Sequence, residues 1–140
     1  MGYLSESILV DLSEILENAE SFEVYFQDTK RHKNIFDFNS KYIDFQANQV
    51  AKNISDELRK DLISGFLKDV EKGGKGSRCW IPHHGIRAFY KNQLIEIAVC
   101  FMCSWFRGEM LEERFYGTFP EEEKSESKLL FDKIIAELDL

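Results

Sequence analysis

Residues 79–106 read CWIPHHGIRAFYKNQLIEIAVCFMCSWF, and this stretch determines the fold class. Residues 79–90 and 94–106 are both rich in β-branched and aromatic residues, and Lys91-Asn92-Gln93 separates them as a turn. We therefore predict a β-hairpin with Asn92 at a positive φ angle. The second strand is apolar on both faces, which predicts a central position in a sheet.

Three other segments have the apolar periodicity of amphipathic helices. Apolar residues recur at helical spacing over residues 4–19, over residues 48–70 and again in the C-terminal segment. Gly73-Gly74 is expected to end the middle helix, because glycine adopts the backbone conformation of a helix C-cap. Thr118-Phe119-Pro120-Glu121 has the pattern of a capping box, which predicts that the last helix begins there.

Shorter strands complete the predicted fold. Residues 22–27 alternate between apolar and polar side chains, as a half-buried strand does. The aromatic residues 35–45 predict one or two more short strands, residues 107–109 a turn, and residues 114–119 a further strand. We therefore predict one α+β domain over residues 1–140, an antiparallel sheet with a central hairpin, flanked by N-terminal, middle and C-terminal helices.

The composition excludes several classes of protein. With 44% hydrophobic and 31% charged residues, the chain is expected to be globular rather than disordered. No apolar stretch is long enough to span a bilayer, so we predict no membrane association. A net charge of −7 argues against binding to nucleic acid.

The N-terminal residues lack the basic region of a signal peptide, and the cysteine count is odd, so we expect a cytoplasmic protein with reduced thiols.

The negative charge is concentrated toward both ends of the chain. Residues 1–28 hold seven acidic residues and no Lys or Arg, residues 108–140 hold ten acidic and four basic residues, and residues 29–107 hold 14 basic and 8 acidic residues. Either the terminal helices pack beside the basic middle, or the acids form a surface that captures a basic protein. In the second case the expected binding residues are Glu14, Glu17, Glu121, Glu122, Glu123 and, as an aromatic anchor, Trp105.

One cluster has the side chains that zinc prefers. Cys79, His83 or His84, Cys100 and Cys103 supply Cys and His ligands, and the hairpin would bring them together. Against zinc, Cys100 and Cys103 are three residues apart in a predicted strand, where their side chains would point to opposite faces. We predict no cofactor, with zinc as the alternative. A Cys79–Cys103 disulfide fits the hairpin geometry, although we expect reduced thiols, and a Cys/His enzyme is a weaker third interpretation.

The motif Cys79-x-x-Pro82-x-His84-Gly85-Ile86-Arg87, followed by Val99-Cys100-Phe101-x-Cys103, is distinctive. It resembles a pattern in small, poorly characterised bacterial proteins, Cys-x-x-Pro-Arg-His-Ala/Gly-Ile-Arg, then a hairpin, then Ile-Cys-Phe-x-Cys. His83 stands where that pattern has Arg. The resemblance implies one helix before the motif and another after the sheet, and it implies no mechanism.

By type, a small, acidic α+β chain without a catalytic motif resembles the bacterial immunity proteins, including those of contact-dependent growth inhibition systems. The resemblance implies a non-enzymatic protein that binds and neutralises a cognate toxin. We therefore predict an immunity protein that covers the basic active site of a toxin, such as a nuclease. The alternatives are a zinc-binding domain and, less favoured, a small Cys/His enzyme.

Overall fold

The computed structural model of the chain describes residues 2–3, 6–26, 49–76, 84–110 and 113–138. Its helical elements are α1 (Glu6–Asn18), α2 (Asp56–Lys72), the short 3-10 helix η1 (Glu122–Lys124) and α3 (Glu126–Leu138). Its strands are β1 (Gly2–Tyr3), β2 (Ser21–Phe26), β3 (Gln49–Ala51), β4 (His84–Tyr90), β5 (Gln93–Cys100), β6 (Trp105–Met110) and β7 (Glu113–Thr118).

The strands form one sheet in the order β1-β7-β6-β5-β4-β2-β3. Neighbouring strands are antiparallel except at one edge, where β1 pairs with β7 in parallel. The β4–β5 hairpin lies in the middle of this order, and every residue from Ile95 to Cys100 is buried. The predicted α+β class, with a central hairpin and helices near the start, middle and end of the chain, is confirmed.

The β4–β5 turn has the predicted position and backbone conformation. Tyr90 pairs with Gln93, which leaves Lys91 and Asn92 as a two-residue loop. Their φ angles are 49° and 65°, and both positive values are those of the tight turns that match the twist of a hairpin. The predicted positive φ of Asn92 is therefore confirmed.

The predicted strand over residues 94–106 is wrong in its length. The backbone reverses at residues 101–104, with Ser104 at a φ of 60°, and β6 begins at Trp105. Residues 107–109, expected as a turn, lie inside β6. The apolar pattern of the sequence does not reveal this turn, because Phe101 and Cys103 are buried within it. The pattern therefore continues beyond the end of the strand.

Two helices begin later than predicted. The middle helix starts at Asp56, where the hydroxyl of Ser55 accepts a hydrogen bond of 3.2 Å from the backbone N–H of Leu58. It ends before Gly73, whose φ is 60°, as expected. The last helix starts at Glu126, and Thr118 belongs instead to β7. The predicted strands within residues 35–45 lie outside the described residues.

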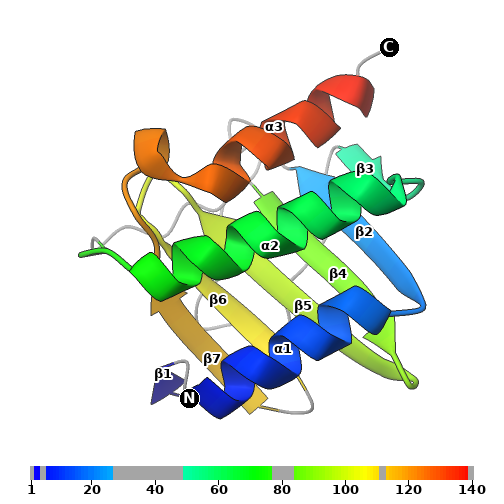
Figure 1. Cartoon of the computed structure of the whole chain (residues 1–140), viewed down its shortest axis with the longest axis horizontal. Helices are drawn as coiled ribbons and strands as arrows, with labels where there is room; N and C mark the ends of the chain where they lie inside the picture. The colour runs from blue at the N-terminus through cyan, green and yellow to red at the C-terminus, as the bar shows by residue number, and fades with distance from the viewer. Residues whose placement is uncertain (1, 4–5, 27–48, 77–83, 111–112, 139–140) are drawn as a thin grey trace.

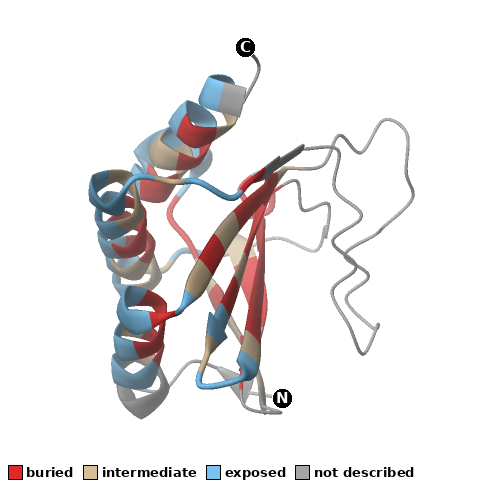
Figure 2. Ribbon diagram, turned by 90° about the vertical axis from the view of Figure 1, so that its right-hand side faces the viewer, coloured by how far each residue is buried: buried red, intermediate tan, exposed pale blue. Residues whose placement is uncertain are grey.

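All three helices pack on one face of the sheet, with α2 between α1 and α3 (Figures 1 and 2). The core fills the space between these two layers, where rings from the sheet and from α2 and α3 pack edge to face. None of the described helices lies on the opposite face of the sheet. The described helices include none that is long and apolar enough to cross a membrane.

Candidate functional site

The helical layer carries the negative charge of the molecule. Together α1, α2, η1 and α3 contain 14 acidic and 7 basic residues, a net charge of −7 that equals the net charge of the whole chain. The acidic segments near the two chain ends therefore lie on the same side of the sheet (Figure 1). They are not in contact along one seam, because α2 lies between α1 and α3.

The predicted acidic residues are all exposed on this layer. Glu14 and Glu17 lie on α1, and Glu121, Glu122 and Glu123 lie in and just before η1. Their carboxylates are open to solvent, so they extend a negative potential from the helical face. We call this surface the acidic helical face.

Trp105 lies on the other side of the sheet from these acids. Its neighbour in β6, Phe106, packs against Phe66 of α2, so strand alternation puts Trp105 on the face away from the helices. The side chain is half-buried. The structure therefore does not bring Trp105 together with the predicted acidic residues.

Asp69 of α2 fixes the start of α3. Its buried carboxylate accepts hydrogen bonds from the hydroxyls of Ser125 and Ser127, at 2.6 and 2.5 Å, and from the backbone N–H groups of Glu126 and Ser127, at 3.0 and 2.9 Å. These N–H groups belong to the first turn of α3, where no carbonyl within the helix can accept from them. One carboxylate thus caps a helix that follows 57 residues later.

The two helices can approach because α2 has a glycine at the crossing. A side chain at Gly65 would place its Cβ 3.2 Å from Cδ1 of Leu130 and 3.4 Å from the backbone nitrogen of Ser127. Gly65 precedes Asp69 by four residues, so both lie on the same face of α2. This close approach positions the acidic residues before α3.

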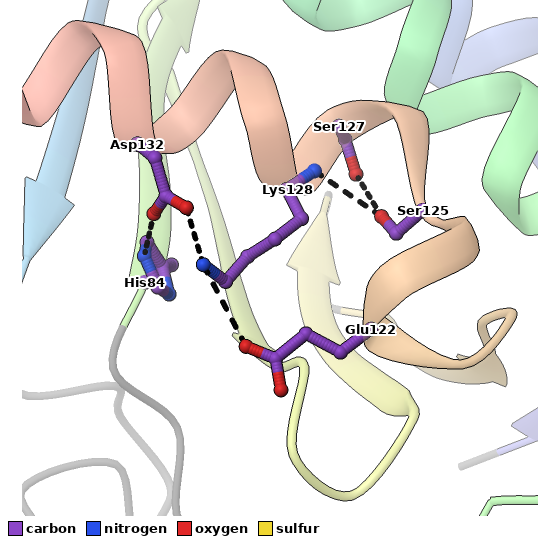
Figure 3. A network of polar contacts seen from close by, with 6 residues as sticks. All are labelled: His84, Glu122, Ser125, Ser127, Lys128 and Asp132. Atoms are coloured by element: carbon purple, nitrogen blue, oxygen red, sulfur yellow. Dashed lines mark hydrogen bonds and ion pairs between the residues drawn. The ribbon is translucent and has the colours of Figure 1, made fainter.

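A polar network continues from α3 to the sheet (Figure 3). The ammonium of Lys128 pairs with the carboxylates of Asp132 and, at 3.6 Å, Glu122, and the other oxygen of Asp132 lies 3.5 Å from Nε2 of His84 on β4. The hydrogen bond with His84 lowers the pKa of the Asp132 carboxyl, Lys128 acts in the same direction, and partial burial opposes both. The network holds Glu122 and α3 against the sheet.

The face of the sheet away from the helices carries a row of charged side chains. Strand pairing sets Glu23 opposite Arg87, Arg87 opposite Glu96, Glu96 opposite Glu109, and Glu109 opposite Arg114. Directly paired residues point to the same face. The row therefore crosses all five strands from β2 to β7.

Ion pairs connect most members of this row. Arg87 lies 3.2 Å from Glu96, and Glu109 accepts from both Arg107, at 3.2 Å, and Arg114, at 3.1 Å. Glu96 and Arg107 are only 4% and 1% exposed. Burying a charge costs free energy, and the opposite charges beside these two residues offset that cost.

A tyrosine extends the row on β2. Burial and the nearby carboxylate of Glu23, which accepts from the Tyr25 hydroxyl at 3.1 Å, raise the pKa of Tyr25. We did not predict this row of charged residues from the sequence. A charged residue within an otherwise apolar strand, such as Glu96, is the sequence feature that could have indicated it.

The structure places His84 and Cys100, two residues of the predicted Cys/His cluster, on opposite faces of the sheet. His84 pairs with Val99, so Cys100, the next residue in β5, points to the opposite face. Cys100 is free and buried, whereas Cys103 is disulfide-bonded, so the expectation of reduced thiols is wrong for Cys103. Cys103 lies in the turn after β5 and not in a strand, so the expected alternation of Cys100 and Cys103 along one strand is wrong.

The zinc alternative stays a prediction. Cys79 and His83 lie outside the described residues. Within the parts of the chain that the structure describes, no three His, Cys, Asp or Glu side chains gather in a way that could hold a metal ion.

Comparison of the chain with protein-family models, with curated proteins and with solved structures found no match.

Proposed function

We propose that this chain is a non-enzymatic protein-binding module whose acidic helical face binds a basic partner protein. The observation that carries the proposal is that the helices hold the entire net charge on one side of the sheet. A single-sign surface attracts a basic partner from a distance and speeds its association. The same charge repels nucleic acid and anionic lipid.

The more specific form of the proposal is an immunity protein in the cytoplasm of a bacterium. In this form the partner is a toxin domain whose active site is basic because it acts on an anionic substrate, as a nuclease does. The acidic helical face would occupy that active site and exclude the substrate. Rigid docking of α3 through Asp69 supports this form, because a preorganised surface loses little entropy on binding.

Capture from the native host tests the proposal first. The tagged chain is isolated gently and examined by native mass spectrometry, and the expected result is a complex with one basic polypeptide. That polypeptide is then purified and its toxicity measured with and without the chain. An acidic partner would contradict the proposal that the acidic helical face binds a basic protein. A partner whose toxicity the chain leaves unchanged would contradict the proposal that the chain is an immunity protein.

Charge variants then locate the binding surface. Glu14→Gln/Glu17→Gln should weaken binding of the isolated partner by about tenfold at low salt, because two attractive charges are lost. The control Gln93→Lys/Met102→Lys raises the net charge by the same amount at two exposed positions, the first residue of β5 and the turn that follows this strand. Equal weakening by both variants would show that net charge alone matters and that the acidic helical face is not the site.

A further inference from the structure

Two hollows are lined by residues of β2, of β3 and of the connection from β3 to α2. The strands β2 and β3 form the edge of the sheet on the right-hand side of Figure 1. The first hollow has a volume of about 380 Å³ and lies between the start of α2 and the end of α3. Its surface is apolar at Ala51, Ile54, Leu58 and Ile134, with Lys52 and Glu137 as its charged residues. An apolar surface with few polar groups is the usual form of a binding site.

The second hollow has a volume of about 300 Å³ and lies beside the start of β2. Phe22 and Ile54 supply its apolar surface, and Lys52, Arg59, Glu20 and Glu23 supply its charges. Lys52 and Ile54 line both hollows, so the two hollows adjoin at the connection between β3 and α2, and we call them together the groove.

The groove runs beside strand edges that no described strand covers. Only Val24, Tyr25 and Phe26 of β2 pair with β3, so no described strand pairs with residues 21–23 on that side. β3 itself is the last described strand of the sheet. Strand edges bind extended peptides through main-chain hydrogen bonds, and adjacent hollows select the side chains.

The charges along the groove alternate in sign. Glu137 lines only the first hollow, Glu20 and Glu23 line only the second, and Lys52 lies between them because it lines both. Arg59 also lines the second hollow and offsets one of the two negative charges there, while its guanidinium donates to the carbonyls of Leu16, at 2.7 Å, and Ala19, at 2.9 Å. Glu20 and Glu23 accept from neutral donors, the backbone N–H of Lys91 and the hydroxyl of Tyr25, each at 3.1 Å, so this end of the groove keeps a net negative charge. The complementary ligand is therefore basic at both ends and acidic in its middle.

We propose that this groove binds an extended peptide segment of a partner protein. The segment places one apolar side chain in each hollow, an acidic residue against Lys52, and basic residues against Glu137 and against Glu20 and Glu23. The site is separate from the acidic residues Glu14, Glu17 and Glu121–Glu123, and none of these lines either hollow.

The probe is the peptide acetyl-Lys-Leu-Asp-Leu-Lys-amide, added to the full ¹⁵N-labelled chain and followed by NMR. The expected result is saturable shifts of the amides of residues 20–23 and 51–58. Lys52→Glu should weaken binding by about tenfold, because it replaces attraction by repulsion. The peptide with Lys in place of its Asp should bind this variant better than the original peptide does.

Lys60→Glu is the matched control, since Lys60 is exposed on α2 and lines neither hollow. It should leave peptide binding within about twofold of the unchanged chain. Equal weakening by Lys52→Glu and Lys60→Glu, or shifts centred on Glu14, Glu17 and Glu121–Glu123, would overturn the proposal in favour of non-specific attraction.

Two further outcomes would also overturn it. The absence of saturable shifts would show that the groove takes no such peptide. Shifts of the same amides that depend on protein concentration without peptide would identify a second copy of the chain as the occupant. Because the test uses a defined peptide, its failure leaves the proposed binding of a basic protein untouched.

Discussion

The carboxylate of Asp69 on α2 accepts hydrogen bonds from both the hydroxyl and the backbone N–H of Ser127 on α3, at 2.5 and 2.9 Å. Both residues are fully buried. A negative charge at this point also interacts favourably with the positive end of the α3 dipole. One side chain of the middle helix therefore fixes the start of α3 and, with it, the acidic residues that precede this helix.

Asp69→Ala is expected to lower the free energy of unfolding by about 3 kcal/mol, because four hydrogen bonds to a buried carboxylate are lost and α3 loses its cap. Urea denaturation measures the change. Asp61→Ala, at an exposed position of the same helix, is the control and should change the free energy by less than about 0.5 kcal/mol. Similar losses in the two variants would show that Asp69 is not a cap.

Asp132 should stabilise the fold only when it is ionised. Its folded-state pKa lies below the ordinary value of 3.8, chiefly through the hydrogen bond with His84, so the folded protein binds this proton more weakly than the unfolded chain does. The stabilisation is then present above the unfolded pKa and is lost as the pH falls through the folded pKa.

Unfolding free energies of the unchanged chain and of Asp132→Asn test this dependence. The difference between them should be largest near neutral pH and should shrink as the pH falls below about 4. Lys128→Gln is the control, and it should reduce the pH-dependent difference without abolishing it, because His84 remains. A difference that stays constant through the acid range would contradict the assignment.

Glu109 holds two arginines together on the face of the sheet away from the helices. Glu109→Gln should lower the free energy of unfolding by about 2 kcal/mol, because Arg107, which is 1% exposed, loses a charged partner. Glu121→Gln is the matched control, because its pair with Lys124 is 3.9 Å long and exposed, and such pairs contribute about 0.5 kcal/mol or less.

Adding Arg114→Gln to Glu109→Gln should restore part of the loss, since it removes one of the two positive charges that Glu109 pairs with in the unchanged chain. A double variant that is less stable than Glu109→Gln would contradict the ion-pair interpretation of the row.

The oxidation state of Cys103 distinguishes the disulfide seen in the structure from the zinc alternative. Iodoacetamide in denaturant without reductant should label Cys100 and spare Cys103, because Cys100 is a free thiol and Cys103 is disulfide-bonded. Peptide mass spectrometry identifies the labelled residue. The zinc alternative, with Cys79, His83, Cys100 and Cys103 as ligands, predicts instead that Cys103 is labelled without reduction once a chelator has removed the metal.

Local chemistry explains the elements that the sequence predicts well. The β4–β5 turn depends on two residues that adopt positive φ, and α2 ends at a glycine with positive φ. These signals lie within a few residues of the structure that they determine. The β5–β6 turn has no such signal, because it contains neither glycine nor proline and buries Phe101 and Cys103.

Tertiary contacts explain the elements that sequence reasoning misplaces. The start of α3 is set by Asp69, which is 57 residues from Glu126 and reaches it only after α2 and α3 have packed. The row from Glu23 to Arg114 requires the register of five strands. That both acidic ends of the chain lie on one side of the sheet likewise follows from topology, which charge counting does not reveal.

The association rate of the isolated partner, measured at low and at high salt, shows whether the acidic helical face attracts a basic protein. If the acidic helical face steers a basic protein, the rate of the unchanged chain should fall by about tenfold or more as salt screens the attraction. Glu14→Gln/Glu17→Gln should show a slower rate at low salt and a weaker salt dependence, unlike the control Gln93→Lys/Met102→Lys. A rate that does not change with salt, or that both double variants change equally, would contradict the account.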